Sequence, residues 1–144
     1  MKLIATSAAF AVLGALALSA CAPATQVLQP AAATKAHAGN VTAKGTFRGE
    51  NNHIVTGKAK VSNVDGHWVI TLDENFSLDG APDPKVALGN GQYVEGTILG
   101  ELKSLTGKQS YVLPANLDIG DYNQVYIWCE KFTVSLGVAD LELI

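Results

Sequence analysis

The sequence predicts an all-β fold, an antiparallel β-sandwich of about eight short strands that follows a signal peptide and a flexible tether. Two observations support this fold class. Short runs rich in Val, Ile, Thr, Tyr and Phe alternate with Gly, Asn, Asp and Pro, as is typical of strands joined by turns. No long stretch of residues 45–144 keeps the 3.6-residue apolar period of an amphipathic helix.

The first twenty residues have the layout of a secretory signal peptide. Lys2 provides a positive charge, and residues 3–20 are apolar or small and carry no charge. The run is close to the lower length limit of a membrane span, so a retained helix is the alternative. Leu18-Ser19-Ala20-Cys21 resembles the lipobox of bacterial lipoproteins. The resemblance implies that Cys21 is acylated, for example with palmitate, and becomes the first mature residue, and several acyl chains anchor a protein stably.

The expected location is the bacterial cell envelope. Ala22, rather than Asp, follows the cysteine. By the sorting pattern of Gram-negative lipoproteins, this favours the outer membrane, on its periplasmic side or at the surface. Residues 21–44 are rich in Ala, Thr, Pro and Gln, and we interpret them as a lipidated tether. The signal peptide then spans 1–20 and the folded domain 45–144, which is long enough for one core.

Individual strands follow from alternation and turn residues. Asp65-Gly66 predicts a tight hairpin turn. We expect turns also at 50–52, 90–91 and 116–121, and a loop at 78–84. The expected strands are 45–49, 53–61, 67–72, 85–88, part of 97–105, 109–113, 123–136 and 139–143.

The strand expected at 123–136 has two apolar sets that are out of phase by one residue. The first set is Val125, Ile127 and Cys129, and the second is Phe132, Val134 and Leu136. A regular strand cannot turn both sets toward one core, so we predict a β-bulge near Glu130-Lys131. The alternative is that Val125 to Trp128 is buried on both faces, as in a central strand.

The charge balance excludes one class of partner. The chain carries 10 Lys and Arg against 13 Asp and Glu, and the loss of Lys2 leaves 9 against 13, a net charge of −4. No basic cluster exists, so nucleic-acid binding is not expected.

Cys129 is the odd cysteine of an exported protein once Cys21 carries lipid. Such a residue is a reactive thiol, an intermolecular pair or a buried inert side chain. Lys131 favours a thiolate, whereas Glu130 opposes one. Residues 45–144 hold no second cysteine, so a Cys-x-x-Cys relay is excluded. Redox action would be intermolecular, metal-based or one-electron chemistry.

Candidate metal ligands are few. His53, His67 and Cys129 are the weak candidates for a copper site, which uses two His, one Cys and usually a Met. The chain's one Met leaves with the signal peptide. Four zinc ligands are not evident. Haem ligation by His53 and His67 would need both in one pocket. The plain alternatives are that His53 bonds the neighbouring turn and that His67 is exposed, and the sequence identifies no cofactor.

Two further groups have both a functional and a structural interpretation. Asp73, Asp79 and Asp83 could bind calcium, although turn chemistry explains loop aspartates as well. The larger aromatic residues could line a ligand face, although such residues are more often core; these are Trp68, Trp128, Tyr111, Tyr122 and Tyr126. No serine stands in a nucleophile elbow, so hydrolase chemistry has no support.

Residues 45–144 also contain spaced motifs in a fixed order. They are Gly45-x-Phe47, His53-x-x-x-Gly57, Gly80-x-Pro82-Asp83, Gly107-x-Gln109-x-Tyr111 and Val125-x-Ile127-Trp128-Cys129-x-x-Phe132-x-Val134. This order resembles the DM13 (DM-thirteen) domain family. The resemblance implies a sandwich related to haem-binding domains and a proposed electron-transfer role, with Cys129 at the position of the proposed redox cysteine. Ala81, between Gly80 and Pro82, departs from the family pattern.

The leading hypothesis is a membrane-anchored envelope lipoprotein with a redox or electron-transfer domain that acts through Cys129. Its partners would be membrane lipid, through Cys21, and an unidentified redox partner or ligand. The alternative is a non-enzymatic ligand-binding or adhesion module in which Cys129 is a core residue. Neither hypothesis describes a classical enzyme.

Overall fold

The computed structural model describes residues 40–144. The signal peptide, the lipid site Cys21 and residues 21–39 of the expected tether lie outside the described residues. Within residues 40–144, no helix has the length and apolarity needed to cross a membrane.

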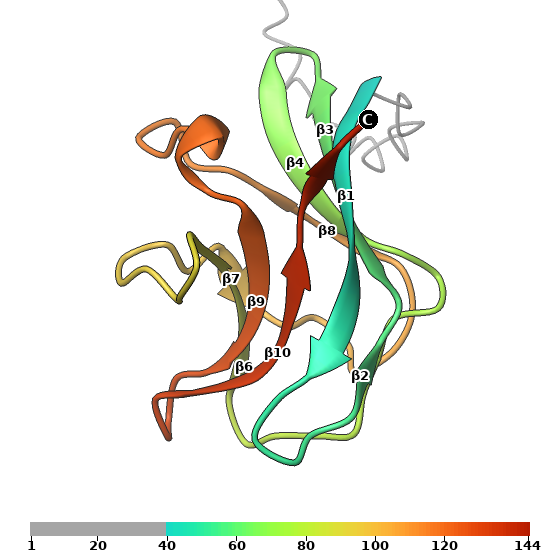
Figure 1. Ribbon diagram of the computed structural model, residues 1–144, viewed down its shortest axis with the longest axis vertical. Coiled ribbons are helices and arrows are strands. Elements are labelled where there is room, and N and C mark those ends of the chain that lie inside the picture. Colours follow the sequence, from blue (N-terminus) through green and yellow to red (C-terminus); the bar gives the residue numbers. More distant parts are fainter. Residues whose placement is uncertain (1–39) are drawn as a thin grey trace, which may run out of the picture. The chain divides into compact units, whose positions relative to one another are not determined.

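Strands dominate the described part of the chain (Figure 1). The strands are β1 (Asn40–Gly49), β2 (Val55–Thr56), β3 (Lys58–Val64), β4 (His67–Leu72), β5 (Ser77–Leu78), β6 (Pro84–Gly89), β7 (Gly100–Glu101), β8 (Gln109–Val112), β9 (Gln124–Cys129), β10 (Val134–Asp140) and β11 (Glu142–Leu143). A short 3-10 turn, η1, covers Ile119–Asp121.

The main sheet is antiparallel and runs in the order β7-β6-β9-β10-β1-β3-β4-β8, with β11 paired to β1 and a separate β2-β5 ribbon. Strand β1 belongs to both halves of this sheet. Its first part pairs with β3, from Asn40↔Asn63 to Thr46↔Lys58, and its last part pairs with β10, from Phe47↔Ala139 to Gly49↔Gly137. The sheet therefore curls over itself, and the two halves face each other (Figure 1). The predicted all-β antiparallel class is confirmed, with β1 joining the two layers.

Two glycines permit the close approach at this shared strand. A Cβ on Gly45 would lie 2.2 Å from the Asp140 carbonyl oxygen. A Cβ on Gly137 would lie 2.7 Å from Val55 Cγ2 and 2.9 Å from the Arg48 carbonyl oxygen. Because side chains cannot fit at these distances, β1 and β10 can cross only where glycine stands.

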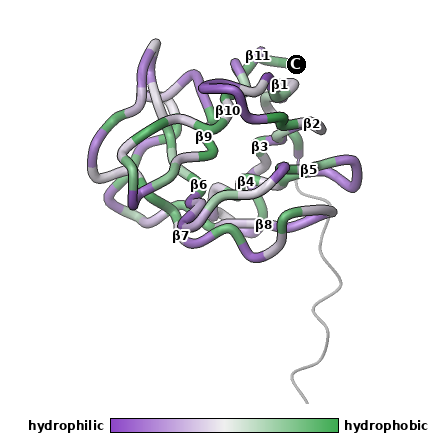
Figure 2. The backbone as a smooth tube through the Cα atoms, turned by 90° about the horizontal axis from the view of Figure 1, so that it is seen from below, coloured by the Kyte–Doolittle hydropathy of each residue, from purple (hydrophilic) through white to green (hydrophobic). Residues whose placement is uncertain are grey.

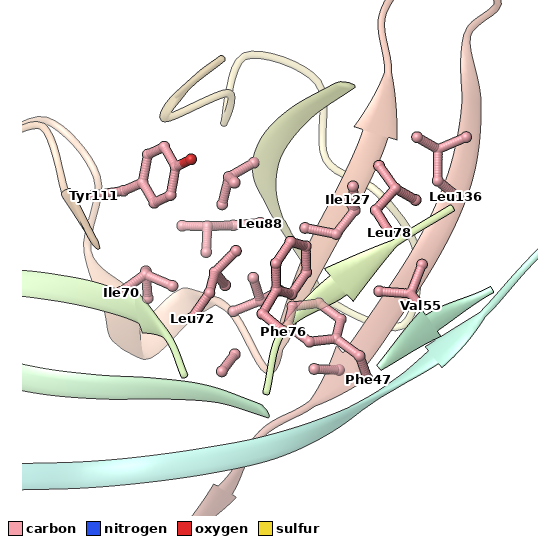
Figure 3. Close-up of a cluster of buried hydrophobic side chains, with 14 of the residues drawn as sticks. Phe47, Val55, Ile70, Leu72, Phe76, Leu78, Leu88, Tyr111, Ile127 and Leu136 are labelled. Carbon is pink, nitrogen blue, oxygen red and sulfur yellow. The ribbon is translucent and has the colours of Figure 1, made fainter. Parts of the chain in front are cut away.

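The core fills the space between the two halves (Figure 3). Phe47 and Phe76 meet edge to face with ring centroids 5.5 Å apart. Fully buried aliphatic side chains of both halves surround them, among them Ile70, Leu72, Leu88, Ile127 and Leu136. Each contributes about 1.5–3 kcal/mol relative to an exposed position. Figure 2 shows hydrophobic segments of the strands between hydrophilic turns.

A buried polar network connects the two edges of the curled sheet. Gln109 Oε1, on β8, accepts from Lys103 N at 3.0 Å and Ser104 N at 3.2 Å, and Gln109 Nε2 donates to Ser104 O at 2.8 Å. The Tyr111 hydroxyl accepts from Lys103 N at 3.1 Å and donates toward Gln109 Oε1 at 2.8 Å. These bonds tie the segment after β7 to β8, so the Gly-x-Gln-x-Tyr motif has a structural role.

The predicted boundary between tether and domain needs a correction. Strand β1 begins at Asn40, five residues before the expected start of the domain at 45. Ala43, Gly45 and Phe47 point inward and alternate with exposed residues. Ala and Gly are poor strand formers, so their alternation gave no apolar signal.

The second strand expected, 53–61, is interrupted. Gly57 has φ +92°, and a Cβ there would lie 2.5 Å from Phe76 Cα. The segment therefore breaks into β2 and β3 at this glycine. The Asp65-Gly66 hairpin is confirmed, with φ of 50° and 83° at its two turn residues.

The long strand expected at 123–136 is two strands. Residues 130–133 form a turn between β9 and β10, so the predicted bulge at Glu130-Lys131 is wrong. The phase change between the two apolar sets comes from this hairpin, and a register shift occurs farther on, between Ser135 and Gly137. The alternative is confirmed: β9 lies between β6 and β10 and is buried on both faces. The last strand also differs, since β10 runs to Asp140 and β11 covers Glu142–Leu143.

Candidate functional site around Cys129

Cys129 is the last residue of β9 and lies inside the fold. Its register partners are Pro84 on β6 and Val134 on β10. The thiol is free, the residue is 1% exposed, and it belongs to the main core cluster. Val125 and Ile127 precede it on the inward face of the same strand. The period-2 geometry of a central strand therefore places the thiol among apolar side chains.

The turn that follows Cys129 is short and has an unusual backbone. Thr133 N donates to Glu130 O at 3.3 Å, which closes the turn, and Glu130 N donates to Asp83 O at 3.1 Å. Thr133 has φ +55°. A β-branched residue in this conformation is strained by about 1–3 kcal/mol. The covered thiol thus adjoins a strained turn.

Charged side chains gather near Cys129 but on the other face of the sheet. Lys85 pairs in register with Trp128, whose side chain points outward. Lys85 Nζ lies 2.9 Å from Asp83 Oδ1, 3.1 Å from Glu101 Oε1 and 3.5 Å from Glu130 Oε2. The hydrogen bond that the Lys85 ammonium donates to Asp83 raises the pKa of Lys85 most, and the bond that it donates to Glu101 raises it further.

The two charges that the sequence placed near the thiol have other contacts. Glu130 pairs with Lys85, and the Lys131 ammonium lies 5.6 Å from the centroid of the Phe132 ring. Among residues 40–144, no hydrogen bond reaches Cys129 Sγ within the usual distances. Thiolate activation by a neighbouring cation has no geometric support in the closed fold.

An aromatic cluster covers the outer face of β9. Trp128 stacks on Tyr93 with ring centroids 3.9 Å apart and an interplanar angle of 8°. Tyr126 meets Tyr93 edge to face at 6.4 Å. A hollow of about 720 Å³ adjoins this pair and is also lined by Glu95 and Glu130. Burial is the main cause that raises the pKa of Tyr93, and the negative charges of these two carboxylates raise it further.

The five aromatic residues singled out in the sequence are therefore divided. Tyr111 is core, Trp128 and Tyr126 join the outer cluster, and Trp68 and Tyr122 pack against the core at the end where β1 begins. Tyr93 was missed in the sequence. The Asn90-Gly91 turn could have indicated Tyr93, because this turn reverses the chain after β6 and brings Tyr93 opposite Gly89.

The three weak metal candidates do not come together. His53 Nδ1 lies 2.9 Å from Asp79 Oδ1, whose partner oxygen Oδ2 accepts from Ile54 N at 3.0 Å. Both bonds lower the pKa of Asp79, and the bond with His53 has the larger effect. His67 begins β4 at the β3–β4 hairpin, at the end of the fold opposite the β9–β10 turn (Figure 1). Residues 40–144 contain no group of three His, Cys, Asp or Glu side chains placed to hold a metal ion.

The three aspartates proposed for calcium each have a different partner. Asp73 Oδ1 accepts from Lys58 N at 3.1 Å and Asn75 N at 3.2 Å, as in an Asx turn. Asp79 bonds His53, and Asp83 pairs with Lys85. Within the described residues, the turn interpretation therefore holds for Asp73, whereas Asp79 and Asp83 are held by contacts with His53 and Lys85.

The fold and the site define an all-β domain with one sealed thiol at the end of a central strand. A family model described as electron transfer DM13 matches residues 46–141, two thirds of the chain. The chain belongs to this family, as the sequence resemblance predicted. Comparison with curated proteins and with solved structures finds no significant match.

Proposed function

We propose that this chain is an envelope lipoprotein, anchored through lipid on Cys21, whose DM13 domain transfers electrons through Cys129. The family match over residues 46–141 carries the proposal. That span contains one cysteine, so a redox role of a side-chain sulfur in the domain falls to Cys129. The apolar run that ends at Cys21 supports the anchor.

A sealed thiol must become accessible before it exchanges with another protein. Cys129 adjoins the strained turn at Thr133 and stands at the end of both of its strand pairings. Opening there separates only the last residue pairs of the β9–β10 hairpin, whereas global unfolding exposes the whole core. We therefore assign access to local opening of this turn, which costs less than global unfolding.

The chemical step is thiol–disulfide exchange with a disulfide of a partner protein. The Cys129 thiolate attacks one partner sulfur, a bond forms between these two sulfurs, and the partner's disulfide bond breaks. The released partner sulfur leaves as a thiolate and takes up the proton that Cys129 lost. A thiolate of a second protein, a dithiol, then attacks the Cys129 sulfur and releases the partner with both of its sulfurs reduced. The other thiol of the second protein closes that protein's own disulfide and restores the Cys129 thiol, so two electrons pass from the dithiol to the partner and the domain needs no other cysteine.

Alkylation kinetics test the access route. In the mature chain with Cys21→Ser, Cys129 is the only thiol, and its modification by iodoacetamide is followed by mass. We expect slow modification without urea, with a urea dependence well below that of global unfolding. Thr133→Gly relieves the turn and should slow modification. A urea dependence equal to that of global unfolding would contradict the proposed role of Cys129.

Asp65→Gly is the matched control for that experiment. Asp65 also has positive φ, at 50°, but in the β3–β4 hairpin at the other end of the fold. Its replacement should leave the modification rate of Cys129 unchanged. Equal slowing by both variants would show that the rate follows overall stability rather than the turn beside the thiol.

The second candidate is a ligand-binding module in which Cys129 is core. The 1% exposure of Cys129 and the hollow beside Tyr93 and Trp128 favour it. Cys129→Ala separates the two candidates. In either case it should lower the free energy of unfolding by about 1–2 kcal/mol, because it leaves a small cavity. The parent chain exchanges with a model disulfide only if Cys129 is the acting residue, and the Cys129→Ala variant then loses this exchange.

The anchor has its own test. Cys21→Ala should abolish metabolic labelling with palmitate and leave the precursor uncleaved in the cell. Cys129→Ala is the control and should be labelled normally. Labelling that persists in the Cys21→Ala protein would rule out this anchor and leave the electron-transfer proposal standing.

A further inference from the structure

The end of the fold where β1 begins has an apolar groove of about 600 Å³. Trp68 of β4 and Tyr122, which follows η1, provide its two aromatic walls. Its main apolar residues, here called the end groove, are Val61, Trp68, Ile119, Tyr122, Leu141 and Leu143. Among residues 40–144, no Lys or Arg side chain lines it.

Exposed apolar side chains continue the end groove. Leu143 is 89% exposed, Ile144 64% and Val41 39%. Ile144 N donates to Thr42 O at 3.1 Å, so these residues are held against the start of β1. Ile54 and Phe132 are also exposed, but they do not line this groove. An apolar groove with exposed apolar side chains nearby is typical of an interaction site.

The course of the chain indicates what covers this surface. Asn40 begins β1, two residues before Thr42 at the groove, and Cys21 is nineteen residues upstream. Nineteen residues span at most about 65 Å. An acylated Cys21 therefore holds the bilayer within that reach of this end. Anchoring raises the effective concentration of lipid at the groove, so a weak apolar contact suffices.

We propose that the end groove docks on the surface of the bilayer that carries the anchor. This inference rests on the proposed lipidation of Cys21. Trp and Tyr are favoured at membrane interfaces, where an apolar ring meets polar headgroups, and Trp68 and Tyr122 would lie at that level. Asp65 and Asp118 stand at the same end, so neutral phospholipid is preferred over anionic lipid.

Docking in this way gives the two ends of the domain different roles. The β9–β10 turn, with Cys129 behind it, lies at the end opposite the start of β1 (Figure 1). The membrane-facing end groove would therefore leave the turn pointing away from the bilayer. A redox partner could reach it without competing with lipid.

The two tryptophans provide an internal comparison. Trp68 lines the end groove, whereas Trp128 lies on the outer face of β9 against Tyr93. The acylated chain is placed in phosphatidylcholine vesicles that carry brominated acyl chains, once with Trp128→Phe and once with Trp68→Phe. We expect bromine to quench Trp68 several-fold more than Trp128. Equal quenching, or stronger quenching of Trp128, would overturn the proposal.

Surface variants sharpen this comparison. Leu143→Asp changes an exposed side chain and should remove most of the quenching of Trp68 while the chain stays on the vesicles. Phe132→Asp, which also changes an exposed apolar side chain but at the other end, should leave quenching intact. Quenching that survives Leu143→Asp would contradict docking through the end groove.

A synthetic anchor separates docking from natural lipidation. Mass determination shows whether the cell acylates Cys21, and the absence of lipid would refute the proposed anchor. The mature chain with Cys129→Ala is then coupled at Cys21 to a maleimide phospholipid, so that no second thiol competes for the reagent. Preferential quenching of Trp68 in this form supports docking, and its absence refutes docking, whatever the natural state of Cys21.

Discussion

Two hairpins of this domain differ in what holds them. The β3–β4 turn has Asp65 and Gly66 at positive φ, and Asn63 Oδ1 accepts from Gly66 N at 3.1 Å. All of these groups are local, and their residue types favour this turn. The β9–β10 turn consists of Glu130, Lys131, Phe132 and Thr133, without Gly, Asn, Asp or Pro.

The second hairpin depends on contacts from elsewhere in the chain. Glu130 N donates to Asp83 O, and the Glu130 carboxylate lies 3.5 Å from Lys85 Nζ. The only positive φ in this turn falls on Thr133, a residue that disfavours it. The comparison shows that the turn beside Cys129 forms through tertiary contacts and against its local preference. Strain of this kind is often found at functional sites.

Removal of the tertiary contact should have the largest effect on Cys129. Lys85→Met leaves Asp83, Glu101 and Glu130 without their shared ammonium, so these carboxylates repel one another and the turn loosens. We expect alkylation of Cys129 to become at least several-fold faster, measured by mass in the Cys21→Ser chain.

Lys108→Met is the matched control for the Lys85 variant. Within the part of the chain that the structure describes, Lys108 pairs with the exposed Glu74 alone, at 3.2 Å. Exposed pairs contribute little, so alkylation should stay near the rate of the parent chain. If Lys85→Met changed nothing either, the idea that Lys85 holds the β9–β10 turn would have to be dropped.

The locally encoded hairpin should show the opposite behaviour. Gly66 has φ +83°, and a Cβ there would meet no atom within 4 Å. Gly66→Ala therefore costs only the backbone conformation, about 1–2 kcal/mol of the free energy of unfolding in urea titrations. Alkylation of Cys129 by local opening should be unaffected. Faster alkylation in this variant would mean that the two hairpins open together.

The same contrast explains what the sequence could predict. The fold class followed from strand runs and turn residues, and the Asp65-Gly66 hairpin followed from a local signal. The β9–β10 hairpin could not be predicted from the sequence. Residues 130–133 contain no turn residue, and the Lys85 side chain that contacts Glu130 comes from β6. The phase change between the two apolar sets correctly indicated an irregularity, but this irregularity is a hairpin turn and not a β-bulge.

The site was predicted to a similar extent. The burial of Cys129 toward apolar neighbours followed from alternation along Val125, Ile127 and Cys129. Tyr93, stacked on Trp128, could not be found this way, because a loop rather than a strand period carries it across the sheet. Likewise, the partner of His53 is Asp79, twenty-six residues away, and not the adjacent turn alone.

The smallest effect concerns acid pH and the loop before β6. Bonds from His53 and Ile54 N lower the pKa of Asp79 below its ordinary value of 3.8. A carboxyl with a depressed pKa in the folded state stabilises the fold above its unfolded pKa, and this stabilisation disappears as the pH falls through the folded pKa. Asp79→Asn should therefore lower the free energy of unfolding slightly at pH 6, and its difference from the parent should shrink as the pH falls through the folded pKa.

Urea titrations of both proteins between pH 3 and pH 6 measure this difference. Asp65→Asn is the control, because it makes the same Asp-to-Asn change in the locally encoded hairpin, away from His53. A constant difference between Asp79→Asn and the parent would show that the His53–Asp79 contact does not stabilise the fold through its charge. The loop before β6 leads to Asp83, which in turn contacts Glu130. In that case the loop is held by hydrogen bonds that do not depend on the charge of Asp79.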